Sequence, residues 1–380
     1  MKTRAAILHE AALPRPYAQS RPISIEEIEF DSPGPGEVVV RIASAGLCHS
    51  DLSSIDGTIP KRFPVALGHE AAGIVEEIGA GVTAVKPGQH VVFSFVPICG
   101  KCAMCLNGKP QLCIAGHAAN IAGEVLRGKT RFRLDGQPVY HHLGVSGFTE
   151  RTVCAEESLV PLPDDVPLSI AAIFGCAALT GLGAVFDTAR VEPGKTVAIF
   201  GAGGVGLMAL LAAICAGATP IVVEPLAAKR ALAHELGASL VVDPAVGDPG
   251  AQIRDRTGTR GVDYAFEATG RSTVVAQALA ATAPGGTAIA IGLPHRDETV
   301  AVSPFELVQT ERTLKGSFMG SAFPRRDVPK YVALWRSGRL PVERLISGTM
   351  QIEDLNTAFD CLADGEVVRS MCLFPVHAAA

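Results

Sequence analysis

The first third of the chain is a succession of short apolar runs rich in valine and isoleucine. Glycine and proline separate these runs, as in the turns Pro33–Gly36 and Lys86–Gly88. Runs of this length between turn residues are typical of β-strands. The expected strands lie at Met1–Leu8, Glu37–Ile42, Gly73–Ile78 and His90–Ser94. The pattern therefore predicts a mostly antiparallel β-domain.

A different pattern begins near residue 178, where continuous apolar runs alternate with longer helical ones. The expected strands are Thr196–Phe200, Pro220–Glu224, Val262–Phe266 and Thr287–Gly292, and the expected helices include Gly203–Ala216 and Ala227–Leu236. Strands that alternate with helices form parallel βαβ units. This half of the chain is therefore predicted to be an α/β domain with a doubly wound parallel sheet.

The last sixty residues change pattern again. Asp327–Ser337 and Ile352–Asp364 have helical spacing, and Arg369–Phe374 is typical of a strand that could rejoin the first domain. We therefore predict a β-rich domain at 1–177, an α/β domain at 178–318, and a return to the first domain at 319–380. A chain of 380 residues is long enough for two or three such domains.

Composition narrows the class of protein. The chain is 48% hydrophobic and 19% charged, which suits an ordinary globular α/β protein. The net charge of −5 provides no general attraction to nucleic acid or an anionic membrane, so neither is expected as a partner. The apolar start, Met1–Leu8, is too short for a signal peptide. Ten cysteines without such a peptide indicate a cytoplasmic protein in which clustered cysteines bind metal rather than form disulfides.

One complete set of metal ligands lies in a single short stretch. Cys99, Cys102, Cys105 and Cys113 are separated by two, two and seven residues. Four thiolates this close can surround a tetrahedral ion, as in a closed structural zinc site. Iron–sulfur clusters are the chief alternative, but ferredoxin-like runs have a shorter last gap followed by proline, and here Ile114 follows.

A second candidate set is dispersed along the chain. Cys48, His69 and Cys176 supply three ligands, which leaves a fourth position for water or substrate. Three protein ligands with one open position are typical of a catalytic zinc. Taken singly, a histidine such as His69 is more often a buried core residue than a metal ligand. Together the two sets predict two zinc ions per chain, one structural and one catalytic.

A glycine-rich turn between a strand and a helix indicates a dinucleotide site. The run is Gly201, Ala202, Gly203, Gly204, Val205 and Gly206. Gly201 suits the tight turn, Gly203 a close approach of pyrophosphate, and Gly206 the packing of helix on strand. Glu224, about twenty residues on, would bind the adenosine ribose and disfavour a 2′-phosphate, so the expected cofactor is NAD. Lys229 and Arg230 lie close enough to weaken that preference.

These motifs resemble the zinc-containing alcohol dehydrogenases of the medium-chain dehydrogenase/reductase superfamily. The run from Gly68-His69-Glu70 to Val82 is similar to the family signature, and the resemblance extends over essentially the whole chain. It implies a GroES-like catalytic domain joined to a Rossmann domain. The long segment between Cys113 and Cys176 resembles the dimeric liver-type branch, which implies a homodimer, with a tetramer as the alternative.

The resemblance also implies roles for residues near the metal. Cys48, His69 and Cys176 would bind the catalytic zinc, Asp51 would orient the histidine ligand, and Glu70 would lie close behind the ion. Ser50 would take the proton of the alcohol. The implied cofactor contacts are His49 and Arg369 to pyrophosphate, Thr180 near the nicotinamide, and Ile291, Gly292 and Leu293 along its ring.

Two departures from the family pattern bear on activity. Ser53 stands where liver-type enzymes often place the histidine that ends a proton relay. Ile59 and His117 stand where glutathione-dependent formaldehyde dehydrogenases place charged anchors for their substrate. The positions that match the substrate pocket are all apolar: Ile59, Phe95, Leu143, Leu293 and Phe318.

An apolar pocket predicts an uncharged aliphatic or aromatic alcohol or the corresponding aldehyde as substrate, with hydride transfer to NAD. Within enzymes, the alternative is a dehydrogenase acting on a glutathione or other thiol adduct. Outside enzymes, the alternatives are a non-catalytic NAD-binding relative and a zinc-binding interaction module, although no zinc ligand is lost in this chain.

Overall fold

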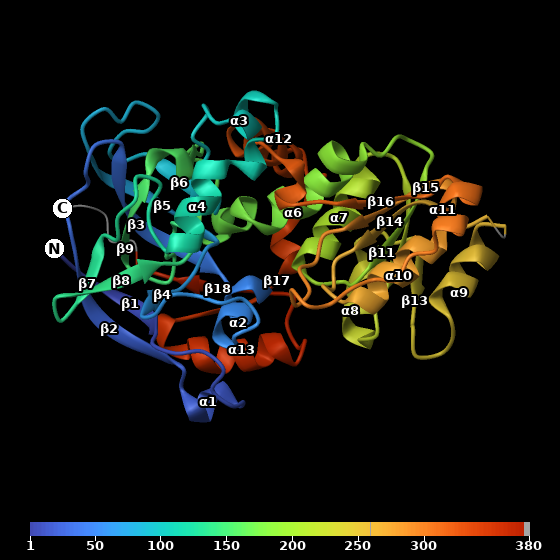
Figure 1. Cartoon of the computed structure of the whole chain (residues 1–380), viewed down its shortest axis with the longest axis horizontal. Coiled ribbons are helices and arrows are strands. Elements are labelled where there is room, and N and C mark those ends of the chain that lie inside the picture. Colours follow the sequence, from blue (N-terminus) through green and yellow to red (C-terminus); the bar gives the residue numbers. More distant parts are fainter. Residues whose placement is uncertain (259, 376–380) are drawn as a thin grey trace. The chain divides into compact units, whose positions relative to one another are not determined.

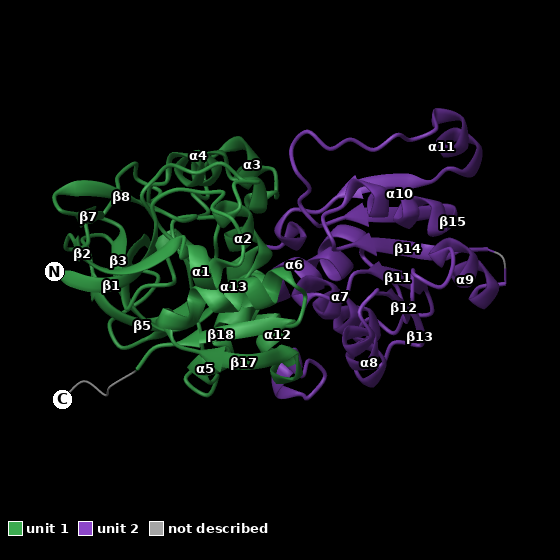
Figure 2. Cartoon of the chain, turned by 90° about the horizontal axis from the view of Figure 1, so that it is seen from below, with its two compact units in different colours: residues 1–176, 323–333, 342–380 green, residues 177–322, 334–341 purple. Residues whose placement is uncertain are grey.

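The computed structural model describes residues 1–258 and 260–375, which divide into two compact units (Figure 2). The first unit contains residues 1–176, 323–333 and those from 342 onward. The second contains residues 177–322 and 334–341. The short segment 334–341 belongs to the second unit, whereas the sequence pattern assigned all of 319–380 to the first domain.

The first unit is β-rich. In its described part, five strands close a barrel in the order β1-β2-β7-β8-β4, and seven form a sheet ordered β10-β6-β5-β3-β18-β17, with β9 beside β3. The strands are β1 (Lys2–Leu8), β2 (Ile23–Phe30), β3 (Glu37–Gly46), β4 (Val65–Ala66), β5 (Ala71–Ile78), β6 (His90–Phe93), β7 (Phe132–Leu134), β8 (Gln137–His141), β9 (Arg151–Ala155), β10 (Leu159–Pro161), β17 (Ile346–Met350) and β18 (Arg369–Leu373). Only the β4–β8 and β17–β18 pairs are parallel among these strands, as a mostly antiparallel domain requires.

Strand β3 is the centre of the seven-stranded sheet and leads directly to the functional site. It pairs with β5 and β9, and nine of its ten residues are buried. The C-terminal strand β18 also pairs with it, with Met371 opposite Gly46. The last strand therefore lies in the sheet of the first unit and places Arg369 near the residues that follow β3.

The helices of the first unit are mostly short. They are α1 (Tyr17–Ser20), α2 (His49–Ile55), α3 (Ala103–Leu106), η1 (Pro110–Leu112), α4 (Ile114–Ala122), η2 (Glu156–Ser158), α5 (Leu168–Ala171), η3 (Ala172–Gly175), α12 (Pro324–Arg336), η6 (Val342–Leu345), η7 (Ile352–Asp354) and α13 (Leu355–Ala363). The predicted helix at 352–364 is thus a 3₁₀ turn followed by α13. Phe359 of α13 packs edge-on against Phe148, with ring centroids 6.2 Å apart, which anchors this helix in the core.

The second unit is a doubly wound α/β domain (Figure 1). Its described part has a parallel sheet of six strands in the order β13-β12-β11-β14-β15-β16. The strands are β11 (Thr196–Phe200), β12 (Thr219–Val223), β13 (Leu240–Val242), β14 (Val262–Glu267), β15 (Thr282–Ala290) and β16 (Thr313–Gly316). The order runs outward from β11 to β13 and then returns to β14. The order therefore reverses at the carboxyl ends of β11 and β14, and folds of this kind bind ligands at such a point.

Helices precede, connect and follow the strands of this sheet. They are α6 (Ala177–Gly183), η4 (Ala184–Ala189), α7 (Gly204–Cys215), α8 (Ala227–Glu235), α9 (Pro249–Arg256), α10 (Ser272–Ala281), α11 (Pro304–Thr310) and η5 (Met319–Ser321). The elements predicted for this half of the chain are present, with shifts at their ends. The largest shift is in β15, which ends at Ala290, so that Ile291 and Gly292 lie just beyond the strand.

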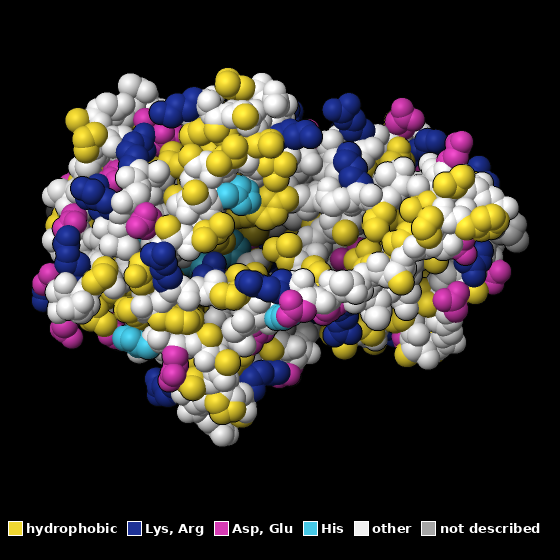
Figure 3. Space-filling view, in the orientation of Figure 1, with side chains coloured by type: hydrophobic (Ala, Val, Ile, Leu, Met, Phe, Trp, Pro, Cys, Tyr) yellow, Lys and Arg dark blue, Asp and Glu magenta, His cyan; other side chains and the backbone are white. Residues whose placement is uncertain are grey.

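Apolar side chains also reach the surface. Figure 3 shows them gathered over the region of α3 and α4, where Leu106, Leu112, Ile114 and Ile121 are exposed.

In the part of the chain that is described, no single helix is long and apolar enough to cross a membrane. The bent pair Leu168–Gly175 and Ala177–Ala189 meets that test only when its two helices are taken together.

Candidate metal centres and nucleotide site

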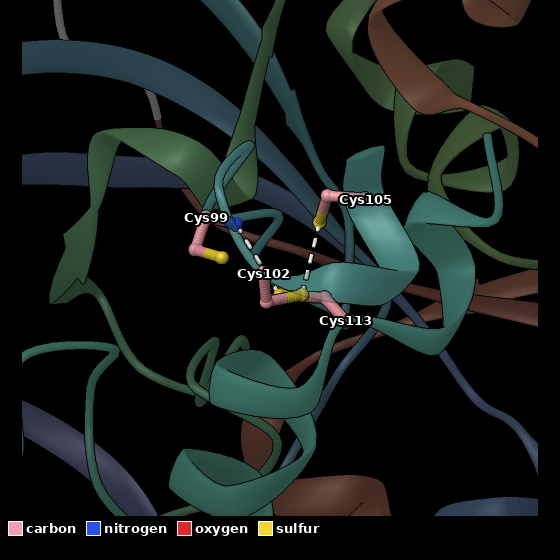
Figure 4. A group of neighbouring side chains, drawn as sticks. All are labelled: Cys99, Cys102, Cys105 and Cys113. Atoms are coloured by element: carbon pink, nitrogen blue, oxygen red, sulfur yellow. Dashed lines mark hydrogen bonds between the residues drawn. The ribbon is translucent and has the colours of Figure 1, made fainter. Parts of the chain in front are cut away.

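The four clustered cysteines converge in space (Figure 4). Their sulfur atoms all lie within 4.8 Å of one another. Cys102 Sγ is 3.5 Å from Cys105 Sγ and 4.0 Å from Cys113 Sγ. Around a tetrahedral zinc with Zn–S bonds of about 2.3 Å, sulfur atoms are separated by about 3.8 Å. The sulfur positions therefore fit a closed zinc site.

The backbone of the four-cysteine lobe (residues 99–113) supports thiolates. Cys113 is the N-cap of α4, and its sulfur accepts hydrogen bonds from the N–H groups of Gly116 at 3.4 Å and Cys99 at 3.3 Å. The N–H groups of Cys105 and Ile114 lower the pKa of the Cys102 thiol to about 6. A deprotonated sulfur is the form that binds metal. Backbone N–H groups thus favour the thiolate at Cys102 and partly offset the burial that raises the pKa of Cys113.

The dispersed ligands also converge, although three separate segments supply them. Cys48 is the N-cap of α2, His69 follows β4, and Cys176 follows η3. Their ligand atoms lie within 4.8 Å of one another, and Cys176 Sγ is 3.5 Å from His69 Nε2. Tetrahedral zinc with bonds of about 2.3 Å to sulfur and 2.05 Å to nitrogen would hold two such atoms about 3.6 Å apart. This open ligand group (Cys48, His69, Cys176) therefore fits zinc and leaves a fourth position.

Asp51 lies behind the histidine ligand. Its Oδ2 is 2.9 Å from His69 Nδ1, on the side of the ring away from the open ligand group, and both side chains are buried. Burial opposes ionisation of Asp51, but the neighbouring imidazoles outweigh burial and hold its pKa below the ordinary value. An ionised Asp51 would leave Nε2 of His69 directed at the open ligand group, so the geometry is compatible with the orienting role, which stays a prediction.

His142 was not identified from the sequence. Its Nδ1 lies 2.9 Å from Oδ1 of Asp51, and its ring meets the His69 ring edge-on with centroids 5.5 Å apart. The adjacent pair His141-His142 was the only sequence signal, and nothing in the spacing of that pair points to Asp51.

Glu70 and Arg369 form a buried ion pair. Arg369 Nη1 donates to Glu70 Oε2 at 2.8 Å and to the carbonyl of Leu47 at 2.7 Å. Glu70 is not among the clustered ligand atoms of the described residues, and its expected place behind the metal remains a prediction. The expected contact of Arg369 with pyrophosphate stays a prediction.

Two other expected residues of the first unit, Ser50 and Phe95, lie near the open ligand group. Ser50 Oγ is 4.0 Å from Cys48 Sγ. The Phe95 ring meets the His69 ring edge-on, with centroids 5.7 Å apart. Ile59 and Leu143 are half-buried, and the N–H of Ile59 donates to the carbonyl of Ser53 at 2.8 Å. His49 is exposed at the first turn of α2.

The glycine-rich turn has the geometry that a dinucleotide site requires. Gly201 has φ of +97°, which favours glycine. A Cβ on Gly206 would lie 1.9 Å from the carbonyl oxygen of Gly201, so only glycine allows α7 to pack this closely. A Cβ on Gly203 would meet no described atom within 4 Å, which leaves that side open to a ligand. Gly204 and Val205 begin α7, whose N-terminal N–H groups suit a phosphate.

Glu224 lies at the end of β12 beside this turn. Its Oε2 accepts from the N–H of Ala202 at 2.7 Å and its Oε1 from that of Leu226 at 2.9 Å. A carboxylate has about four acceptor sites, so two remain for ribose hydroxyl groups. Burial lowers the pKa of Lys229, and the nearby Glu224 partly opposes that shift.

The residues expected along the nicotinamide ring are spread over the second unit. Thr180 is half-buried on α6, and Phe318 is half-buried just before η5. The N–H groups of Ile291 and Gly292 donate to the carbonyl of Glu267, and Leu293 after them is exposed. Gly292 is required by packing, because a Cβ there would lie 2.1 Å from the N atom of Gly270.

A β-rich unit with two zinc-compatible cysteine groups and a dinucleotide-binding fold define a nicotinamide-dependent dehydrogenase of the metal-containing class. Two family models agree: "Alcohol dehydrogenase GroES-like domain" matches residues 34–164, and "Zinc-binding dehydrogenase" matches residues 204–337. The chain belongs to the zinc-dependent alcohol dehydrogenase family and is an oxidoreductase.

Similar proteins span the full chain. S-(hydroxymethyl)glutathione dehydrogenase of Paracoccus denitrificans is 38% identical over 384 residues, covering 98% of this chain and 100% of that one. Alcohol dehydrogenase class-3 of Cereibacter sphaeroides is 38% identical over 385 residues, with the same coverage. These relatives establish the family, and their different names leave the substrate open.

Solved structures agree with this assignment. An alcohol dehydrogenase zinc-binding domain protein from Burkholderia ambifaria has a TM-score of 0.93 at 33% identity, covering 99% of this chain and 100% of that one. Benzyl alcohol dehydrogenase from Acinetobacter calcoaceticus has a TM-score of 0.92 at 29% identity, with the same coverage. A structure from Sinorhizobium meliloti 1021 with bound NADP has a TM-score of 0.81 at 27% identity, covering 98% and 100%.

Proposed function

We propose that this protein oxidises an uncharged, apolar primary or secondary alcohol to the aldehyde or ketone, reversibly, with hydride transfer to NAD. The observation that carries the proposal is the open ligand group, in which three converging ligands leave a fourth position. Zinc bound there would act as a Lewis acid and lower the pKa of an alcohol. The Phe95 ring beside His69 supplies an apolar wall.

Other residues of the first unit would orient the histidine ligand and accept the proton of the alcohol. Asp51 keeps His69 in the tautomer that faces the metal position. Ser50, on the first turn of α2 next to Cys48, accepts the proton of the alcohol. With Ser53 in place of a histidine, no base of pKa near 7 ends the relay at that position. Oxidation should therefore accelerate towards alkaline pH.

Variants of the two serines test this route. Ser50→Ala should lower kcat/KM for alcohol oxidation far more than Ser53→Ala, because only Ser50 contacts the reacting proton. Ser53→His should raise the rate near neutral pH and flatten the pH profile. Equal effects of the two alanine variants would contradict the assignment of Ser50.

NAD is preferred to NADP in this proposal because Glu224 faces the expected ribose position and repels a 2′-phosphate. The positive charges of Lys229 and Arg230 argue against this preference, as does the similar structure that holds NADP. The ratio of kcat/KM for NAD to that for NADP tests this preference. Glu224→Ser should lower the ratio of kcat/KM for NAD to that for NADP by at least about tenfold. A preference of the wild-type enzyme for NADP would contradict the proposed role of Glu224.

The second candidate is a dehydrogenase of S-(hydroxymethyl)glutathione, which the name of the Paracoccus denitrificans relative favours. Against it, Ile59 cannot pair with a charged group, and His117 is engaged with the carbonyl of Gln111 at 3.1 Å. A panel of benzyl alcohol, hexanol, ethanol and the glutathione adduct separates the two. The kcat/KM for benzyl alcohol and for hexanol should exceed that for ethanol, since each buried CH₂ adds roughly 0.8 kcal/mol of favourable transfer free energy. Efficient turnover of the adduct, well above benzyl alcohol, would favour the second candidate.

We also propose two zinc ions per chain and a homodimer. The zinc count is supported by two ligand groups that each fit tetrahedral zinc. The dimer is supported by exposed Phe305 and Val308 on α11 and by the exposed edge strand β16. Metal analysis should give about two zinc per subunit, and light scattering after gel filtration should give the mass of two chains. A tetramer is the alternative outcome.

A further inference from the structure

A buried row of polar side chains continues behind the histidine ligand. It runs from His69 through Asp51 to His142, with nitrogen-to-oxygen distances of 2.9 Å at both steps. It ends at Ser54, whose Oγ is 3.3 Å from His142 Nε2 and 3.1 Å from the carbonyl oxygen of Ser50. All four side chains are buried, so each depends on the others for polar contacts.

Asp51 has two oxygens with different tasks. Oδ2 faces His69, and Oδ1 accepts the N–H of Gly68 at 3.1 Å and faces His142. The terminal torsion of an aspartate is broad, so a carboxylate held firmly at one oxygen alone can turn. Contact at both oxygens determines the plane of the carboxylate, and with it the direction in which His69 Nε2 points.

His142 is itself held rigidly. Its backbone N–H is shared between the carbonyl of Ala66 at 3.2 Å and Ser146 Oγ at 3.1 Å. Its backbone carbonyl accepts from the backbone N–H groups of Val145 and Ser146. Nδ1 makes no hydrogen bond of standard geometry with any described residue, and the polar atom that it approaches is Oδ1 of Asp51, at 2.9 Å. The carboxylate of Asp51 is therefore the group that this nitrogen serves.

We propose that His142 is a positioning residue that fixes the Asp51 carboxylate and thereby holds His69 in its metal-binding orientation. The inference rests on the proposed function, because it requires a metal at the open ligand group. A buried aromatic side chain that only fills space would not place a nitrogen against a carboxylate. His142 therefore belongs to the apparatus that retains the metal, although it cannot reach the ion while Asp51 stands between them.

Two variants separate positioning from packing. The amide nitrogen of asparagine reaches roughly the place of histidine Nδ1, so His142→Asn keeps a donor for Asp51 but loses ring volume. His142→Phe keeps the volume but loses the donor. His142→Gln, whose amide reaches the place of Nε2, is a further donor-displaced variant should the phenylalanine variant fail to fold. His141→Asn is the matched control, because His141 is equally buried and lies beside Ser146 and Arg131 instead.

The measurement is the rate of zinc release from the purified enzyme to a colorimetric chelator, together with the melting temperature. His142→Phe and His142→Gln should release one zinc about 10–100-fold faster than wild type. His142→Asn and His141→Asn should stay within about threefold of wild type. The proposal is overturned if the rate of zinc release depends on side-chain volume, so that His142→Asn releases zinc fast and His142→Phe slowly. It is also overturned if no variant at position 142 changes the rate.

Two further outcomes are informative. A third metal per chain, lost in His142→Phe, would make Asp51, His69 and His142 a metal site of their own and overturn the positioning role. The Cys176→Ala variant is measured in parallel as a check on the proposed function. If it holds as much zinc as wild type, the open ligand group binds no metal, and the proposed function fails independently of His142.

Discussion

The two cysteine groups of the first unit are built in opposite ways. The four-cysteine lobe takes all its ligands from fifteen consecutive residues, 99–113, and closes around its centre with backbone N–H groups. The open ligand group draws on three segments spread over residues 48–176, and its histidine ligand lies against Asp51, which His142 approaches in turn. In the lobe, a bound metal would stabilise a short segment that has little core of its own. In the open ligand group, the folded core would hold the metal and leave one coordination position free.

The largest expected effect comes from removing one ligand of the open group. Cys176→Ala should reduce alcohol oxidation by at least about 1,000-fold, because the Lewis acid is lost. The core around position 176 does not depend on the ion, so the melting temperature should change little. Activity assays, metal analysis and thermal unfolding on one preparation check this. Substantial activity with one zinc per chain would contradict the contrast between the two groups.

The converse variant acts on the lobe. Cys102→Ala should lower the melting temperature and speed hydrogen exchange across residues 99–122 by at least about tenfold, because α3 and α4 are too short to persist alone. The molecules that stay folded should keep most of their kcat. Loss of kcat with an unchanged melting temperature would show that the lobe serves catalysis directly.

A chelator applied to the wild-type enzyme should separate the two ions by rate. The open group has a coordination position through which a chelator can attack, whereas the lobe has none. One zinc should leave in step with activity, and the second at least about tenfold more slowly. Simultaneous loss of both ions would indicate that the two groups are coupled.

The smallest effect concerns the metal-free lobe. Cys102, with its pKa lowered to about 6, should be alkylated faster at pH 7 than Cys105, whose pKa burial and Cys102 raise to about 12. The thiolate is the charged form, so a lowered pKa keeps it populated above pH 6 and loses it below. Alkylation of Cys102 should therefore fall about tenfold from pH 7 to pH 5, as peptide mass spectrometry would show. A Cys105-first order would contradict this.

How far the sequence predicted the site depends on the same contrast. The lobe and the glycine-rich turn are local, so spacing alone indicated their ligands and the need for glycine at 201 and 206. The ion pair of Glu70 with Arg369 joins residues 299 positions apart, and no periodicity in one sequence carries that information. His142 was missed for the same reason, because it meets Asp51 only through the path of β8 and the loop after it. The fold class was predictable because alternation of strands and helices is itself a local pattern.

Helix α2 has a consequence for how this protein can change over time. Its seven residues, with Cys48 as N-cap, present the proposed metal ligand, proton acceptor and orienting carboxylate on little more than one turn. Inserting or deleting one residue there would rotate everything beyond it by about 100° around the helix axis. Substitutions such as serine at position 53 can alter the relay while the frame persists. The length of this segment should thus be far less variable than its composition, and engineered libraries should randomise side chains there but never the spacing.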